Sequence, residues 1–277
     1  MSITPVRLAG STQHVEHVMG MPVVIDVAGP RVDDIVVKGA FAWLHRVDAV
    51  FSTYRDDSRI SRLNRGELTL ADAEPDVREV LERCEELREL TGGWFDARAG
   101  CRAGPVGDGP LPLDPSGLVK GWAVDRAAQI LERGGARAFC INAGGDVLVR
   151  GRPSADEGWL VGIQHPLLPG SIAAVAELDD AALATSGTYA RGAHIRDPFT
   201  GRAPEGLLSV SLTGRDLATT DALATAAFAM GAAAVDWTGR LADFETLTIL
   251  ADERVVSTPG FPLATEDGRT RQPTRTR

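Results

Sequence analysis

The periodicity of apolar residues changes once along the sequence, and this change constrains the fold more than any other feature. Between residues 33 and 133, apolar residues recur at helical spacing, whereas from residue 138 the chain reads mainly as short strands separated by turns. Grouped helices and hairpins are typical of α+β proteins, while a doubly wound parallel sheet needs strict alternation. The pattern therefore predicts an α+β fold with mixed or antiparallel sheets and packed helices.

The individual elements can be placed from their spacing. The clearest helix is 75–90, where one apolar stripe ends at Gly92-Gly93. The other predicted helices are 33–51, 120–133, 219–230 and 232–238. The predicted strands are 21–28, 138–142, 147–150, 159–164, 173–178, 207–213, 244–250 and 254–257.

Charge and composition exclude several classes of protein. The chain of 277 residues has 29 Lys plus Arg against 38 Asp plus Glu, a net charge of −9, which argues against general nucleic-acid binding. Its three cysteines form no zinc or redox pattern. We find no signal segment and no long apolar run, so we expect a cytoplasmic protein without membrane insertion. The basic, polar end of the chain is expected to be disordered.

Four glycine-containing segments interrupt the regular patterns, and each adjoins polar side chains. They are Thr91-Gly-Gly-Trp-Phe-Asp96, Asp114-Pro-Ser-Gly-Leu-Val-Lys-Gly121, Asn142-Ala-Gly-Gly-Asp146 and Thr185-Ser-Gly-Thr188. Any one of them alone is better explained as a connecting turn, but together they are typical of loops that bind phosphate or metal. No GxGxxG or GxxxxGK[ST] motif is present, so nothing favours a Rossmann or P-loop site.

Two of the polar candidates lie on predicted helices. Lys120 stands at the predicted start of a helix, where a cation and N–H groups suit a phosphate, although Asp114 or Ser116 could simply cap that helix. Asp221 and Thr225 are spaced i, i+4, so their oxygens share one helical face and could bind a hard cation. Alternatively, Asp221 favours the helix dipole and Thr225 belongs to a packing face of small residues.

Two further candidates come from loops. His194 lies three residues before Asp197 and could act as a general base with an orienting partner, or it could be a structural histidine. Tyr54, one of two tyrosines, is either a core residue or a platform on which a flat heteroaromatic ring stacks.

Taken together and in order, these segments resemble the ApbE family of FAD:protein FMN transferases. The resemblance runs from about Met19 to about Leu250, and eight segments in register carry it. They are Met19-Gly20, Phe51-Ser-Thr-Tyr-Arg55 with Ser58-Arg-Ile-Ser-Arg-Leu-Asn64, Gly92-Gly-Trp-Phe-Asp96, Asp114-Pro-Ser-Gly-Leu-Val-Lys-Gly-Trp-Ala-Val-Asp125, Asn142-Ala-Gly-Gly-Asp146, Thr185-Ser-Gly-Thr-Tyr189, His194-Ile-Arg-Asp-Pro-Phe-Thr-Gly201 and Asp221-Ala-Leu-Ala-Thr225.

The resemblance implies a single domain over residues 19–258, built of two intertwined subdomains, after an N-terminal segment (1–18) and before a tail (259–277). It implies FAD as substrate in a cleft between these parts. Mg²⁺ would be bound there by Asp221, Thr225 and a carbonyl near Gly117, with the catalytic residue His194 near the reacting phosphates. The residues that would line the FAD site are Met19, Tyr54, Trp94, Phe95, Asp96, Asp114, Lys120 and Ile195.

The implied reaction is cleavage of the FAD diphosphate, release of AMP and transfer of FMN to a Thr or Ser hydroxyl of an acceptor flavoprotein. Charge neutralisation by a metal and a cation, with a base for the hydroxyl proton, would serve this chemistry. Two alternatives remain open. One is a Mg²⁺-dependent FAD pyrophosphatase, in which water replaces the acceptor, and the other is a non-catalytic FAD-binding protein.

Overall fold

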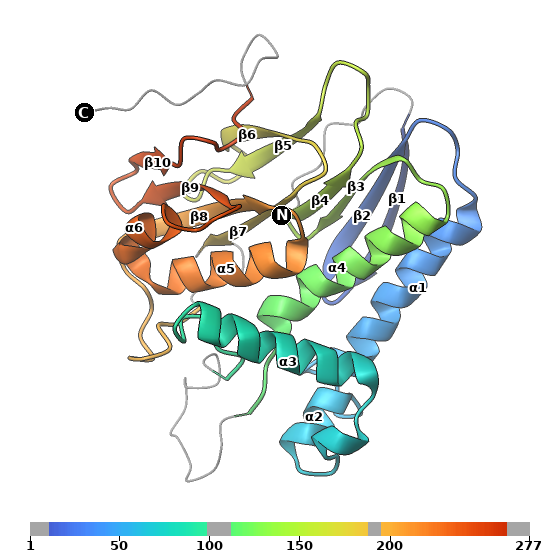
Figure 1. Cartoon of the computed structure of the whole chain (residues 1–277), viewed down its shortest axis with the longest axis vertical. Coiled ribbons are helices and arrows are strands. Elements are labelled where there is room, and N and C mark those ends of the chain that lie inside the picture. Colours follow the sequence, from blue (N-terminus) through green and yellow to red (C-terminus); the bar gives the residue numbers. More distant parts are fainter. Residues whose placement is uncertain (1–10, 99–111, 188–194, 265–277) are drawn as a thin grey trace.

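An antiparallel sheet of eight strands forms the centre of the structure, a computed structural model that describes residues 11–98, 112–187 and 195–264 (Figure 1). The order in this sheet is β1-β2-β3-β4-β7-β8-β9-β10, which is chain order with one hairpin left out. Its strands are β1 (Thr12–Val18), β2 (Met21–Ala28), β3 (Ala138–Ala143), β4 (Asp146–Arg150), β7 (Ala182–Gly187), β8 (Leu207–Gly214), β9 (Glu245–Leu250) and β10 (Val255–Ser257).

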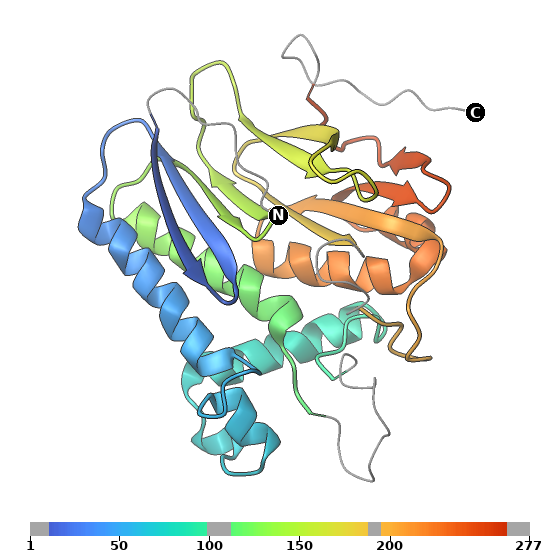
Figure 2. The same cartoon turned by 180° about the vertical axis from the view of Figure 1, so that it is seen from behind.

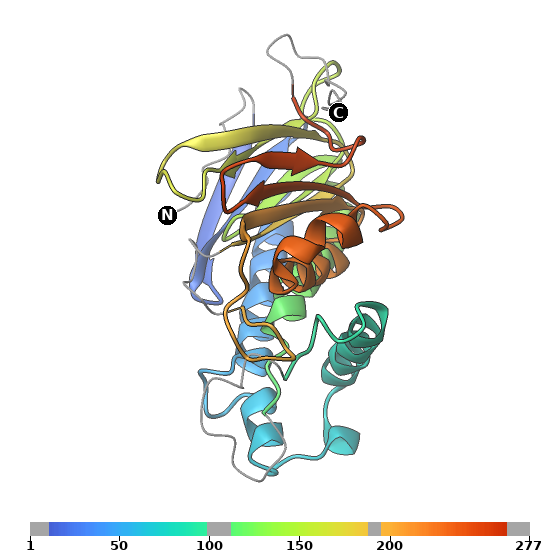
Figure 3. The same ribbon diagram turned by 90° about the vertical axis from the view of Figure 1, so that its left-hand side faces the viewer.

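Helices cover one face of the sheet. In Figure 1 the helices α1, α4 and α5 lie across this face, and the side view of Figure 3 shows α2 and α3 extending beyond the end of the sheet. The helices are α1 (Asp34–Phe51), α2 (Arg59–Asn64), α3 (Pro75–Leu90), α4 (Ser116–Arg133), α5 (Leu217–Ala229) and α6 (Ala234–Thr238), with short 3-10 turns at Leu70–Asp72 and Gly231–Ala233. Their apolar faces form one large core with the inward side chains of the sheet.

The other face of the sheet is covered by a hairpin of β5 (Trp159–Gln164) and β6 (Ile172–Leu178), visible in the rear view of Figure 2. Alternate side chains of β5 point at the sheet, because successive side chains of a strand face opposite ways. Trp159, Val161 and Ile163 are buried there against sheet residues such as Val147 and Val149, in a second, smaller core.

The predicted α+β class is confirmed, and most elements lie where the spacing placed them. Helix α3 has the predicted bounds, and α1 begins one residue later, after Asp33, whose carboxylate accepts a hydrogen bond from the N–H of Ile35. The prediction for α4 was wrong at its start. This helix begins at Ser116, four residues before Lys120, so Lys120 lies in its second turn.

Four elements were not predicted: β1, α2, β7 and the 3-10 turn at Leu70–Asp72. β1 pairs with β2 along its whole length, from Thr12 opposite Val27 to Val18 opposite Met21. The segment 185–187, interpreted as a glycine-containing turn, is the end of β7, which pairs with β8. At the other end of the described chain, Phe261 is buried and Leu263 bridges to Ala176 of β6. Of the predicted tail, residues 265–277 lie outside the described residues.

Within the described ranges, no helix is both long enough and apolar enough to cross a membrane.

Candidate functional site

A cleft of about 1270 Å³ brings the sequence motifs together. It exceeds the 300–1,000 Å³ typical of small-molecule pockets, so it has room for a ligand as large as a dinucleotide. Every predicted site residue that the structure describes lines it: Met19, Tyr54, Trp94, Phe95, Asp96, Asp114, Gly117, Lys120, Ile195, Asp221 and Thr225. His194 lies outside the described residues.

The close contact of α4 with α5 builds the charged side of this cleft. A Cβ atom at Gly121 of α4 would lie 2.4 Å from the carbonyl oxygen of Leu217, so only glycine permits this approach. Asp125, one turn further along α4, joins the two helices, since its carboxylate accepts hydrogen bonds from the N–H groups of Leu217 (2.8 Å) and Ala218 (2.9 Å). Burial raises the pKa of Asp125 to about 6, although the two N–H donors act in the opposite direction.

Helix α5 is buried on all sides between the sheet and the other helices. Twelve of its residues are buried, Asp221 among them, because its sequence is made almost wholly of small and apolar side chains. Asp221 and Thr225 share one face of the helix, as their i, i+4 spacing predicts, and that face lines the cleft, with Asp221 buried and Thr225 half-buried.

One ammonium group lies between two buried carboxylates at this point. The Lys120 Nζ atom forms an ion pair with Oδ2 of Asp146 and lies 3.3 Å from Oδ2 of Asp221. The side chains of Asp146 and Asp221 are 5% and 7% exposed, and that of Lys120 is 21% exposed. Three elements, β4, α4 and α5, thus each contribute one charge.

The oxygen atoms around this cluster suit a hard cation. Gly117 in the first turn of α4 faces Thr225, because a Cβ atom at Gly117 would lie 3.9 Å from the Thr225 Oγ1 atom. A carboxylate, a hydroxyl and a main-chain carbonyl make an all-oxygen set of the kind that Mg²⁺ prefers, completed by water and phosphate. In the described parts of the chain, no three His, Cys, Asp or Glu side chains cluster closely enough to bind a metal, so Thr225 and backbone oxygens are needed here. The residues present therefore fit Mg²⁺.

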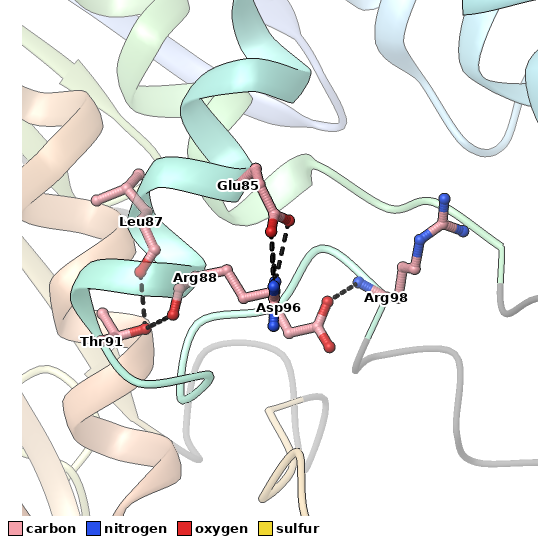
Figure 4. A network of polar contacts seen from close by, with 6 residues as sticks. All are labelled: Glu85, Leu87, Arg88, Thr91, Asp96 and Arg98. Atoms are coloured by element: carbon pink, nitrogen blue, oxygen red, sulfur yellow. Dashed lines mark hydrogen bonds and ion pairs between the residues drawn. The ribbon is translucent and has the colours of Figure 1, made fainter.

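The turn after α3 carries the aromatic part of the cleft, and Figure 4 shows polar contacts that hold this turn, among them those of Thr91 and Asp96. The Thr91 hydroxyl donates to the carbonyl of Leu87 (2.8 Å) and accepts from the N–H of Phe95 (2.9 Å), which ties the turn to the helix. Phe95 is buried beneath Gly117, and Asp96 accepts a hydrogen bond from the N–H of Arg98 (2.8 Å).

Neighbouring contacts order the rest of this wall. The ring of Trp94 meets Phe199 edge-on, with centroids 4.9 Å apart. The loop before α4 is held because the Asp114 N–H donates to the carbonyl of Ala97 (2.7 Å) and its carboxylate accepts from the N–H of Ser116 (3.1 Å). Asp114 thus shapes the chain just before the helix, although the N-cap residue is Pro115.

The rim of the cleft carries two unusual residues. Met19 has a φ of 54° and Gly20 a φ of 72° in the two-residue turn between β1 and β2, which matches a type I′ turn. A methionine with positive φ is conformationally costly, and such residues concentrate at functional sites. Tyr54 is 97% exposed, so the alternative that it is a core residue is wrong.

Asp197 as the partner of His194 stays a prediction, and the structure shows a local role for its carboxylate. The Asp197 carboxylate accepts hydrogen bonds from the N–H groups of Phe199 (2.8 Å) and Thr200 (3.2 Å) and so closes the turn that follows. Ile195 and Arg196, the first described residues after His194, both line the cleft.

Asp146 was not predicted as a site residue, although it ends the glycine-containing segment 142–146. Glycines 144 and 145, with φ of 64° and 109°, turn the chain between β3 and β4, and the Asn142 side chain accepts a hydrogen bond from the N–H of Gly145 (2.9 Å). This turn places Asp146 at the cleft. The tip of the β5–β6 hairpin, residues 164–166 and 169, also lines the cleft and carries no signal of its own.

Comparisons with known proteins agree on one family. The model of the family described as "ApbE family" matches residues 19–103 and 106–247. The FAD:protein FMN transferase of Vibrio cholerae is 27% identical over 241 residues, which span 68% of this chain and 71% of the relative, and that of Haemophilus influenzae is 26% identical over 69% and 71%. In structure, the ApbE protein of Thermotoga maritima superposes with a TM-score of 0.79 at 22% identity, covering 90% of this chain and 97% of that one. This last similarity concerns the fold.

Proposed function

Because the chain belongs to the ApbE family and is a transferase, we propose that it cleaves the diphosphate of FAD and attaches FMN to an acceptor flavoprotein. One observation supports this most. Residues from motifs spread over two hundred positions line a single cleft large enough for FAD, and its charged side combines a cation with oxygen atoms of the kind that could bind a metal.

In the proposed reaction, a Thr or Ser hydroxyl of the acceptor attacks the phosphorus on the FMN side of the diphosphate. A phosphoester bond forms, the bond to the bridging oxygen breaks, and AMP leaves with that oxygen. The hydroxyl proton passes to a base. No covalent intermediate with the enzyme is needed, so the work of the protein is to place the two reactants and to balance charge.

The charged side of the cleft would meet the diphosphate. Asp221, Thr225 and a backbone carbonyl near Gly117 would hold Mg²⁺, which when bound offsets the negative charge of the phosphate oxygens. Lys120 would offer its ammonium donors to the same oxygens, and its half-buried position strengthens such a contact relative to one in open water.

The aromatic side would hold the organic parts of FAD. Tyr54 is an exposed ring on the rim and is suited to stack on the flavin. Trp94 is fixed by Phe199, and Phe95 fills the space below Gly117, so this wall is ordered before any ligand arrives. Because these side chains are already ordered, less conformational entropy is lost when a ligand binds.

His194 as the base stays a prediction, as does the cytoplasmic location. The position of His194 in the chain, directly before two residues that line the cleft, supports the first. A neutral imidazole near pH 7 is suited to accept the proton of a hydroxyl as the phosphoester forms.

The test is mass spectrometry of a purified flavoprotein acceptor domain after incubation with the protein, FAD and Mg²⁺. The acceptor should gain the mass of FMN less one water, and AMP should appear in equal amount. An acceptor whose target Thr is replaced by Ala should gain nothing. AMP and free FMN in equal amounts, with an unmodified acceptor, would instead identify the hydrolysis of FAD by water. If FAD is not consumed at all, the protein binds FAD without catalysing a reaction.

A further inference from the structure

Asp146 is a carboxylate with no role in the proposed reaction, yet it is among the most firmly held groups in the cleft. Its Oδ1 atom accepts a hydrogen bond from the N–H of Thr185 on the neighbouring strand β7 (3.0 Å). The hydroxyl of Thr185 is itself hydrogen-bonded to that of Ser211 on β8 (2.8 Å). A buried, anchored carboxylate is expensive to maintain unless a cation faces it.

Its cation is Lys120, which Asp146 shares with Asp221. The Oδ2 atom of Asp146 pairs with Nζ of Lys120, and the same Nζ lies 3.3 Å from Asp221. Asp146 and Asp221 carry one negative charge each, and Lys120 carries one positive charge. One ammonium thus serves two carboxylates, and only one of these, Asp221, belongs to the proposed metal set.

The choice of a lysine here is informative in this chain. Lys38 and Lys120 are its two lysines, against 29 Lys plus Arg in all, so nearly every other cation is an arginine. An ammonium is a compact point charge with three rotatable donors, whereas a guanidinium is a rigid planar fork. A compact group with rotatable donors can therefore pair with either of two neighbouring carboxylates.

We propose that Asp146 is a positioning residue that retains Lys120 at the cleft when Mg²⁺ takes Asp221, and that Lys120 competes with Mg²⁺ for Asp221 in the empty site. This proposal rests on the metal site proposed above. Lys120 would neutralise Asp221 before the metal binds. Metal binding would then move the ammonium fully onto Asp146, beside the place where the diphosphate binds.

The first test measures Mg²⁺ binding by calorimetry to the full chain without FAD. Lys120→Met should bind Mg²⁺ about tenfold more tightly than the unchanged protein, because the competing cation is gone. Asp146→Asn should bind it about tenfold more weakly, because Lys120 then settles on Asp221. The asparagine oxygen can still accept from Thr185, so the fold is conserved.

The double variant Lys120→Met with Asp146→Asn decides whether Asp146 acts through Lys120. It should stay within about threefold of Lys120→Met alone, since a residue that acts through another loses its effect when that other is removed. A full tenfold loss in the double variant, or unchanged affinity in Lys120→Met, would overturn the proposal. Glu79→Gln is the matched control, because Glu79 pairs with Arg126 of α4 outside the cleft lining, and it should leave Mg²⁺ affinity unchanged.

A second test needs no metal and separates this proposal from the metal site. In ¹⁵N correlation spectra, an ammonium held in an ion pair gives a sharp signal because its protons exchange slowly with water. The exposed Lys38 shows, in the same spectrum, how an ammonium in open solvent behaves. The Lys120 signal should be present in the unchanged protein, persist on addition of Mg²⁺ and change its chemical shift in Asp146→Asn, where Asp221 becomes the partner of the ammonium. If it is unaffected by Asp146→Asn, Asp146 does not hold Lys120. If Mg²⁺ fails to bind and the signal still depends on Asp146, only the proposed metal site and the competition fail.

Discussion

Gly121 of α4 and Leu217 at the start of α5 approach so closely that a side chain at Gly121 would begin 2.4 Å from the Leu217 carbonyl oxygen. This contact sets the distance between the helix that carries Gly117 and Lys120 and the helix that carries Asp221. The geometry of the charged cluster therefore depends on a residue that has no chemistry of its own.

Gly121→Ala should accordingly destabilise the protein by about 1–3 kcal/mol through overpacking, although alanine is the better helix former. Gly39→Ala is the matched control. Gly39 lies inside α1, and a Cβ atom there would make an ordinary 3.8 Å contact with Ile130, so stability should rise by about 0.4–1 kcal/mol. Urea unfolding of both variants measures the difference. Equal effects of the two substitutions would show that α4 and α5 can separate at little cost.

Asp125 should make stability depend on pH between about 4 and 6. Its pKa is about 6 in the folded protein against an ordinary 3.8, so the protonated form is favoured by folding. That contribution is complete below pH 3.8 and is lost as the pH rises through 6. It amounts to roughly 3 kcal/mol, about two pH units at about 1.4 kcal/mol each. Asp125→Asn cannot titrate, so the unchanged protein should lose stability relative to this variant over that range. The free energy of unfolding of both proteins is measured at pH 4, 5, 6 and 7. If it changes with pH in the same way in both, Asp125 is not the group responsible.

Asp221→Asn should abolish the Mg²⁺-dependent release of AMP from FAD. The structure buries this carboxylate beside Lys120, so we also expect a loss of about 1–3 kcal/mol in unfolding free energy. Asp236 is an exposed acid on α6 and serves as the control. Asp236→Asn should change neither the release of AMP nor the free energy of unfolding. Full turnover in Asp221→Asn, or in excess chelator, would remove both the residue and the metal from the reaction.

Tyr54→Ala should weaken FAD binding by roughly 1–3 kcal/mol, the range for loss of a stacked ring, and leave the free energy of unfolding unchanged. The second expectation follows from the 97% exposure of this side chain. Tyr54→Phe keeps the ring and should bind FAD almost as the unchanged protein does. Fluorescence titration measures all three affinities. If Tyr54→Ala binds FAD normally, the flavin ring lies elsewhere.

His194→Ala should lower the rate of FMN transfer by about 10²–10⁴-fold and change FAD affinity far less, as expected for loss of a general base. His45→Ala is the control, since His45 pairs with Glu16 on the surface. A parallel fall of rate and affinity would instead indicate a phosphate contact. An unchanged rate would reject both roles.

The elements that sequence patterns predicted well are those whose burial is one-sided. Helix α3 buries one stripe of residues and exposes the rest, so its period is visible in the sequence. β1 was missed because it lies at the edge of the sheet, where Val15 is 57% exposed and only Val18 is buried, so no alternation marks it. β7 was missed for the opposite reason. It is a central strand made of small residues, and its Thr-Ser-Gly end resembles a turn.

The site was predictable as a set of motifs but not as a set of contacts. Gly117, Asp221 and Thr225 could be named because each sits in a recognisable segment. The link between Lys120 and Asp146 could not, since it joins α4 to a strand 26 positions later, and only the close packing of helix on sheet brings the two together. The start of α4 was placed too late because Pro115, Ser116 and Gly117 are poor helix formers that tolerate a first turn.

The hairpin that is left out of the sheet order has a consequence for how this cleft can change over evolution. β4 and β7 are direct neighbours in the sheet, so the β5–β6 hairpin between them is a detour from a strand order that otherwise follows the chain. Insertions, deletions and substitutions at the tip of that detour alter one wall of the cleft while the ladder between β4 and β7 keeps its register. Asp146 and Thr185 lie beside that ladder. The chain can therefore diversify what its cleft admits without rebuilding the charged cluster that faces it.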